Sequence, residues 1–111
     1  MRVLLDSCVL RKLAREISAH EVQTAPQLGW GDLDDGPLLT AISGGFDAFI
    51  TVDKSLRHQQ NLSSRLFGVI ILRAKTNRLL DLLPLVPELR AVLDEILPGE
   101  VREIGIIDDS K

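Results

Sequence analysis

The chain has 111 residues, 45% of them hydrophobic and 26% charged, which is the size of one domain with enough apolar side chains for a single core. The net charge of −3 argues against a uniformly basic nucleic-acid-binding protein. No stretch approaches the roughly 20 apolar residues that span a bilayer, and the single cysteine excludes an intrachain disulfide. We predict one domain over residues 1–107, a frayed tail at 108–111, no membrane association and a cytoplasmic location.

Strand-like segments recur along the chain. Residues 2–6 and 48–53 are apolar runs that each end in an aspartate, and residues 21–24 alternate in polarity before Pro26. Residues 68–73 are almost continuously apolar, as a central parallel strand should be. Residues 100–106 alternate again and predict a final strand at an edge of the sheet.

Helical spacing fills the segments between these strands. Ser7 is a candidate N-cap for the first helix, and Pro37 suits the first turn of the second. Pro84 and Pro87 mark a break or a late start in the last and longest helix, whose apolar face offers a surface for pairing with a second copy or a partner. The expected helices cover residues 9–17, 37–43, 56–61 and 79–97.

The alternation of strands and helices defines the expected fold class. It predicts an α/β protein, a three-layer α/β/α sandwich with a mainly parallel sheet of about five strands. In such a fold the carboxyl ends of the strands lie along one edge, and ligands bind in the crevice outside that edge.

Two aspartates are the main candidates for chemistry at that edge. Asp6 closes the first strand and Asp53 closes the third, and a doubly wound sheet can bring these two strand tips side by side. A hard cation such as Mg²⁺ or Mn²⁺ would relieve the repulsion between the carboxylates and could activate water for attack on a phosphodiester. Either aspartate could instead act only as a helix cap.

Asp34 and Asp35 precede the second helix near the same edge and could supply a third carboxylate. The alternative is that these acids only complement the dipole at the start of that helix. The sequence does not decide between the two.

Positive charge is concentrated in one segment of the chain. Residues 54–78 hold six basic side chains and no acidic one, whereas residues 1–53 hold four basic and eight acidic side chains. The basic segment could meet a phosphate backbone, or it could form a solvated face paired with distant acids. Its cations are Lys54, Arg57, Arg65, Arg73, Lys75 and Arg78.

A series of motifs extends over residues 1 to about 105 in a fixed order. The motifs are Met1-Arg2-Val3-Leu4-Leu5-Asp6, Leu28-Gly29-Trp30-Gly31, Asp35-Gly36-x-Leu38-Leu39, Phe46-Asp47-x-Phe49-Ile50-Thr51-x-Asp53-x-x-Leu56 and Gln59-Gln60-Asn61-Leu62. In this order they resemble the short PIN-like proteins, relatives of the PIN ribonuclease domain, some of which resemble toxins encoded beside a small antitoxin.

The resemblance implies a metal-dependent endoribonuclease, a phosphodiester hydrolase. Asp6 matches the acid of the first strand and Asp53 the acid of the Thr-x-Asp motif, so these two would bind Mg²⁺ or Mn²⁺ with assistance from Asp35. Ser7 and Pro37 stand where short PIN-like proteins often carry glutamate, and proline cannot bind metal through its side chain. The alternative is therefore a degraded PIN-like module that binds RNA or a partner protein without cutting. A phospho-acceptor receiver ranks third.

Within that resemblance, the basic segment supplies the expected contacts to RNA. Trp30 could stack on a base or anchor its loop on the core. The expected partners are RNA, a small antitoxin protein and a second copy of the chain. The predicted substrate-binding residues are Ser7, Lys54, Arg57, Arg73, Asn77 and Arg78.

Overall fold

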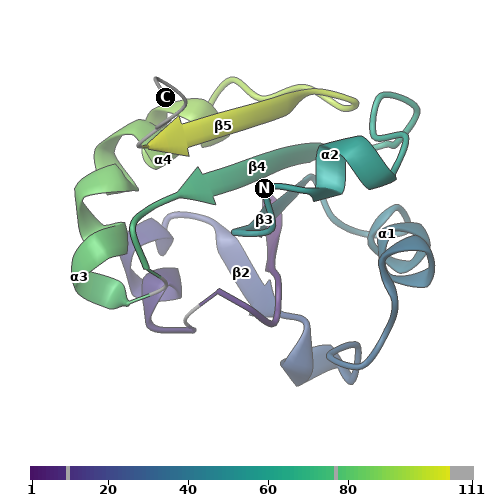
Figure 1. Ribbon diagram of the computed structural model, residues 1–111, viewed down its shortest axis with the longest axis horizontal. Coiled ribbons are helices and arrows are strands. Elements are labelled where there is room, and N and C mark those ends of the chain that lie inside the picture. Colours follow the sequence, from purple (N-terminus) through teal and green to yellow (C-terminus); the bar gives the residue numbers. More distant parts are fainter. Residues whose placement is uncertain (10, 77, 106–111) are drawn as a thin grey trace.

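The computed structural model describes residues 1–9, 11–76 and 78–105, and for Arg57 only the backbone (Figure 1). The strands are β1 (Arg2–Leu5), β2 (Glu21–Thr24), β3 (Ala48–Thr51), β4 (Gly68–Arg73) and β5 (Val101–Gly105). The α-helices are α1 (Asp35–Ile42), α2 (Leu56–Gln59), α3 (Leu79–Leu82) and α4 (Val86–Leu93). Shorter-pitched 3-10 helices are η1 (Arg11–Ile17), η2 (Pro26–Leu28) and η3 (Leu83–Leu85).

The strands form one parallel sheet in the order β2-β1-β3-β4-β5. The predicted α/β class is confirmed. The almost continuously apolar strand β4 lies inside the sheet, between β3 and β5, and β5 lies at an edge, both as predicted. Strands β1 and β3 are neighbours, with Leu5 paired to Ile50, and the backbone N–H of Asp6 donates to the carbonyl of Ile50 at 2.9 Å. The tips of the first and third strands therefore lie side by side.

Two apolar clusters cover the two faces of the sheet and give the three layers. Because side chains alternate along a strand, Leu4 and Phe49 face α1 and α2, whereas their neighbours Leu5 and Ile50 face η1, α3 and α4. All four side chains are at most 1% exposed, and each contributes about 1.5–3 kcal/mol by leaving water. The packed sheet is a rigid support for the loops at its edges.

The helices differ from the predicted ones in ways that the local sequence explains. In place of the helix expected at 9–17, the structure has the 3-10 helix η1, which begins at Arg11. A turn in which the Val9 N–H donates to the carbonyl of Asp6 precedes it and accounts for the later start. The helix expected over 79–97 is divided into α3, η3 and α4, since Pro84 and Pro87 lack the amide hydrogen that a continuous helix needs. The helix expected at 56–61 ends at Gln59.

The apolar face of the 79–97 segment is not the free surface that the sequence suggested. Its buried residues pack against the sheet in the core cluster that contains Leu5 and Ile50, so that expectation is wrong. The large apolar side chains of the segment that are exposed are Leu80 and Leu97, at 80% and 61% exposure. The buried ones are Leu82, Val86, Leu89, Val92, Leu93 and Ile96.

The end of the chain carries two predictions that the structure does not address. The expected strand ends at Gly105, and residues 106–111, with the predicted tail at 108–111, lie outside the described residues. Among the residues that are described, none of the helices is long and apolar enough to cross a membrane.

Candidate active site

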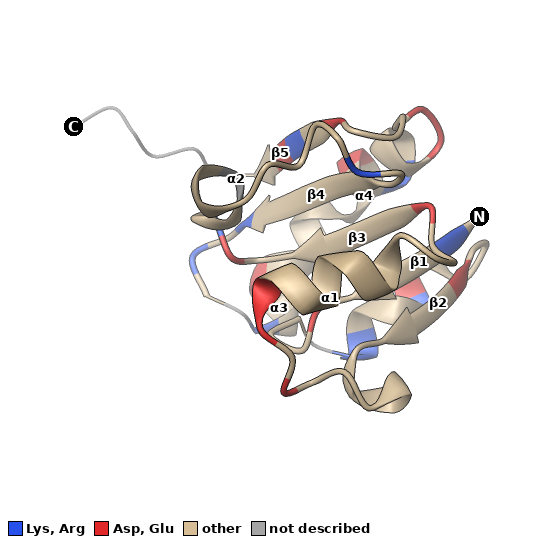
Figure 2. Ribbon diagram, turned by 90° about the vertical axis from the view of Figure 1, so that its right-hand side faces the viewer, with Lys and Arg blue, Asp and Glu red and all other residues tan. Residues whose placement is uncertain are grey.

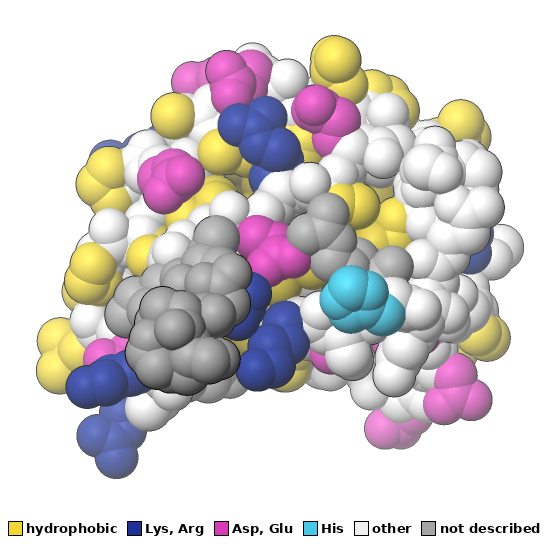
Figure 3. Space-filling model, turned by 45° about the horizontal axis from the view of Figure 1, so that its top comes forward, with side chains coloured by type: hydrophobic (Ala, Val, Ile, Leu, Met, Phe, Trp, Pro, Cys, Tyr) yellow, Lys and Arg dark blue, Asp and Glu magenta, His cyan; other side chains and the backbone are white. Residues whose placement is uncertain are grey.

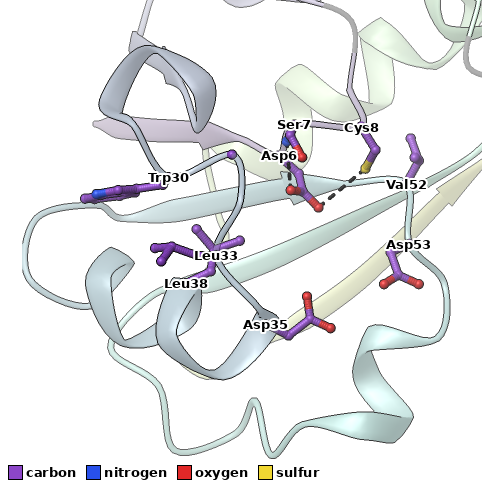
Figure 4. A pocket seen from close by; sticks show the side chains of 10 residues that line it. Asp6, Ser7, Cys8, Trp30, Leu33, Asp35, Leu38, Val52 and Asp53 are labelled. Carbon is purple, nitrogen blue, oxygen red and sulfur yellow. Dashed lines mark hydrogen bonds between the residues drawn. The ribbon is translucent and has the colours of Figure 1, made fainter.

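An open pocket of about 430 Å³ lies at the carboxyl ends of β1 and β3. Its walls come from the turn after β1, the loop after η2, the start of α1 and the two residues after β3, and Figure 2 shows acidic segments at the start of α1 and beyond β3. The predicted carboxylates of Asp6, Asp35 and Asp53 all line it and point into the same space (Figure 4). The other lining residues are Ser7, Cys8, Trp30, Gly31, Leu33, Leu38 and Val52.

Asp6 follows β1 directly, and hydrogen bonds fix its carboxylate. Thr51, the last residue of β3, is completely buried, so its hydroxyl needs a partner inside the protein. It donates to Oδ2 of Asp6 at 2.7 Å, while the backbone N–H of Ser7 donates to Oδ1 at 2.7 Å. The carboxylate is half-buried and oriented by two separate segments, which favours a role that needs a defined position.

Asp53 is held by the turn that follows β3. Its Oδ1 accepts hydrogen bonds from the hydroxyl of Ser55 at 2.6 Å and from the backbone N–H of Ser55 at 3.0 Å. Its own backbone N–H donates to Oγ1 of Thr51 at 3.1 Å, so Thr51 links both aspartates. Within the described part of the chain, Oδ2 of Asp53 makes no hydrogen bond, and this oxygen is available for a ligand.

Asp35 begins α1 on the opposite wall of the pocket. Burial raises the pKa of its carboxyl above the ordinary value, and the negative charges of Asp53, Asp6 and Asp34 raise this pKa further. The three pocket carboxylates thus interact electrostatically. Asp34, the exposed N-cap residue of α1, adds to this field but does not line the pocket.

Cys8 places a thiol beside the Asp6 carboxylate. Its Sγ donates to Oδ2 of Asp6 at 3.4 Å and lies 3.6 Å from Oγ1 of Thr51. Burial is the largest cause that raises the pKa of this thiol, and the charge of Asp6 adds to it. The side chain therefore stays a protonated thiol at neutral pH, consistent with a small, half-buried packing residue.

The predicted substrate-binding residues are spread more widely than the acids. Ser7 lines the pocket, whereas Lys54 and Arg78 are exposed beyond β3 and before α3. Arg73, at the end of β4, forms an ion pair with Glu103 of β5 at 2.8 Å. Basic and acidic side chains are interspersed on the face in Figure 3. Arg57 lies in α2, its side chain outside the description, and Asn77 lies outside the described residues.

Trp30 anchors its loop on the core and also borders the acidic pocket. Its ring packs edge-on against Phe46, with centroids 6.0 Å apart and planes at 75°, and it borders the core cluster on the α1 side. The ring is only half-buried and also lines the acidic pocket. An anchored aromatic wall beside the carboxylates can therefore offer its open part to a ligand.

The donor set fits a divalent cation that keeps much of its water. Carboxylate oxygens are the ligands that Mg²⁺ and Mn²⁺ prefer, and a bound cation would offset the negative charges that, after burial, raise the pKa of Asp35. Across residues 1–9, 11–76 and 78–105, however, no three His, Cys, Asp or Glu side chains stand close enough to enclose an ion. The arrangement suits one or two direct carboxylate ligands rather than a closed cage.

Sequence reasoning did not single out Thr51 or Ser55, which orient the two aspartates. One signal was available for each. A hydroxyl at the end of an apolar strand must find a partner when buried, and a serine two residues after an aspartate is typical of a turn closed by the aspartate side chain.

Comparison of the chain with models of known protein families, with curated proteins and with solved structures finds no match. The resemblance to short PIN-like proteins stays a prediction. An argument about function therefore depends on the chemistry of the pocket.

Proposed function

We propose that the protein is a divalent-metal-dependent endoribonuclease of PIN-like type. The observation that carries the proposal is the convergence of Asp6, Asp35 and Asp53 from three separate segments on one pocket, where burial and then the neighbouring negative charges raise the pKa of Asp35. Carboxylate clusters at the carboxyl edge of a parallel sheet are typical of catalytic and metal-binding sites.

Each acid has a distinct part in this proposal. Asp6 and Asp53 would hold Mg²⁺ or Mn²⁺ through the oxygens that face the pocket, and the cation would supply a lowered pKa for bound water and charge stabilisation for the leaving oxygen. Thr51 and Ser55 keep the two carboxylates oriented. Asp35, whose raised pKa favours proton uptake, would orient a water or accept its proton.

RNA is the proposed substrate because the neighbouring polar and aromatic groups suit it. Trp30 provides an aromatic side chain at the pocket wall, and Ser7 a hydroxyl beside Asp6. The exposed Lys54 and Arg78 could contact phosphates outside the pocket. A role as the toxin of a toxin–antitoxin pair, with a small antitoxin partner and a cytoplasmic location, follows from the resemblance and is part of the proposal.

Cleavage of a mixed RNA pool tests the proposal directly. We expect the wild type to cut RNA with Mg²⁺ or Mn²⁺ and not with chelator, and Asp6→Asn and Asp53→Asn to lose this activity while remaining folded. Asp47→Asn is a matched control, since Asp47 is an exposed acid at the other end of β3 that accepts from the backbone N–H of Arg2. Cleavage that survives in both pocket variants, or in chelator, would refute the metal mechanism.

A non-cutting PIN-like module is the second candidate, favoured by two observations. Within the described residues no three ligand side chains form a ready-made metal group, and Ser7 and Pro37 occupy positions where short PIN-like proteins often carry glutamate. Such a module would bind RNA or a protein partner with no metal-dependent cleavage. Persistent RNA binding by the folded wild type, without cleavage under any metal condition, would favour it.

A further inference from the structure

A second pocket adjoins the acidic one along the same edge of the sheet. It has a volume of about 530 Å³ and lies beyond the carboxyl ends of β1 and β2, which pair along their whole length. Ser7 lines both pockets, so the two are neighbours across the turn after β1. The other residues around the second pocket are Val9, Arg11, Thr24, Pro26 and Gln27.

The loop from Pro26 to Gly31 forms a common wall between the pockets. Pro26 and Gln27 face the second pocket, whereas Trp30 and Gly31 face the acidic one. The Trp30 backbone N–H donates to the carbonyl of Ala25 at 2.9 Å, which holds the loop closed on itself. A ligand long enough to lie across Ser7 would therefore occupy both pockets.

The second pocket differs from the first in charge, because it has a cation and no carboxylate among its lining residues. Arg11 is exposed and, within the described residues, makes no hydrogen bond or ion pair, so its guanidinium is available. The side-chain carbonyl of Gln27 accepts from the backbone N–H of Thr24 at 2.8 Å, which leaves the amide NH₂ group to donate. Guanidinium, amide and hydroxyl groups are donors that recognise phosphate oxygens.

We propose that this second pocket binds a backbone phosphate of single-stranded RNA next to the nucleotide at the acidic pocket, with Arg11 as the principal contact. The proposal deepens the nuclease function and rests on it for the identity of the ligand. The strand would run from the acidic pocket over Ser7 toward η2, with one phosphate beside the carboxylates and the next group of its backbone at Arg11. Opposite charges in adjoining pockets would fix the register of the strand.

Fluorescence anisotropy with a labelled single-stranded RNA of eight nucleotides, measured in chelator so that no cleavage occurs, tests the site. We expect Arg11→Ala to weaken binding about 5- to 10-fold and to reduce the salt dependence by about one phosphate contact. Arg15→Ala is the matched control, because Arg15 is an exposed cation of the same helix η1 that lines neither pocket. It removes the same charge and should change affinity less than twofold.

Equal losses in the two variants would overturn the proposal, since they would reflect general charge rather than a phosphate site. Tighter binding of a phosphoserine peptide than of RNA, lost in Arg11→Ala, would overturn the assignment to RNA. Cleavage assays distinguish failure of the proposed nuclease function from failure of the phosphate site. If RNA binding depends on Arg11 but the wild type does not cleave RNA, only the catalytic function is refuted. If Arg11→Ala cleaves RNA with an unchanged KM, only the phosphate site is refuted.

Discussion

The carboxyl ends of β3 and β4 lie next to each other in the sheet, but charge is paired at the end of β4 and clustered with like charge at the end of β3. At the end of β4, Arg73 is neutralised by Glu103 on the adjacent strand at 2.8 Å. At the end of β3, Asp53 faces a pocket that also holds Asp6 and Asp35, and burial together with these like charges raises the pKa of Asp35.

The difference is one between paired and unpaired charge along one edge of one sheet. An ion pair between neighbouring strands contributes to the fold and leaves little charge for a ligand. Clustered carboxylates reduce stability, and such clusters are common at catalytic and metal-binding sites. Substitutions in the two regions should therefore affect different measurements.

The largest effect is expected from removing a carboxylate of the acidic pocket. Asp6→Asn or Asp53→Asn should lower metal-dependent RNA cleavage by on the order of 10³-fold or more, because each change removes a proposed cation ligand. Cleavage rates at saturating Mn²⁺ would measure it, with circular dichroism to verify folding. A loss of cleavage rate below tenfold in either variant would contradict the proposed functional difference between the ends of β3 and β4.

Replacing the threonine that links the two aspartates should have the next largest effect. Thr51→Val keeps the shape of the buried side chain but removes the hydroxyl that donates to Asp6 and accepts from Asp53. Loss of such a supporting hydrogen bond should lower metal affinity or cleavage by about 10- to 100-fold. Mn²⁺ titration and cleavage kinetics would measure it.

Ser43→Ala is a suitable control for that variant. Its hydroxyl also makes an internal hydrogen bond, to the carbonyl of Leu39 at 3.2 Å, but at the end of α1 opposite Asp35. We expect unchanged cleavage in this variant. Equal activity losses in Thr51→Val and Ser43→Ala would mean that hydroxyl deletion acts through general destabilisation.

The ion pair at the end of β4 should affect stability more than activity. Arg73→Ala should lower the free energy of unfolding by about 1–2 kcal/mol, since the pair is partly shielded from water, with side chains 22% and 15% exposed. Urea denaturation measures the loss, and Lys75→Ala, at an exposed cation two residues on, is the control. A raised KM for RNA without destabilisation would instead support the predicted role of Arg73 in substrate binding.

The smallest effect is an increase in stability. Because the folded pKa of Asp35 is raised, its ionised form destabilises the fold at neutral pH, and this cost disappears as the pH falls through that pKa. Asp35→Asn should therefore raise Tm by roughly 1–3 °C in chelator at pH 7, less than about 1 kcal/mol because solvent screens the group. The gain should shrink at acidic pH, and a gain that is constant from pH 7 to acid would contradict the repulsion.

The sequence alone was sufficient to predict the parallel sheet and the proximity of Asp6 and Asp53 at its edge. Alternating polarity marks β2 and a continuous apolar run marks β4, and both strands match the predicted ranges at every residue. The neighbourhood of Asp6 and Asp53 followed from the general geometry of doubly wound sheets. Asp35 lines the opposite pocket wall as the predicted third carboxylate, although α1 begins at Asp35 and not at the predicted residue 37.

What could not be predicted depends on contacts between distant segments. The hydrogen bond from Thr51 to Asp6 and the ion pair from Arg73 to Glu103 join residues 45 and 30 positions apart, which no local pattern records. The second pocket depends on how the loop after β2 lies beside the turn after β1. Burial of the apolar face of α4 could likewise not be predicted, because an amphipathic pattern does not reveal which element covers the apolar face.

The pairing of β1 with β3 sets how far apart Asp6 and Asp53 are. Each acid follows its strand within two residues, and the ladder that pairs Leu5 with Ile50 fixes where those strands end. The segment between the two strands contributes walls to the pockets but does not set this spacing. Changes in the loops of that segment would therefore alter the pocket walls, whereas the pairing of β1 with β3 would keep the separation of the two acids.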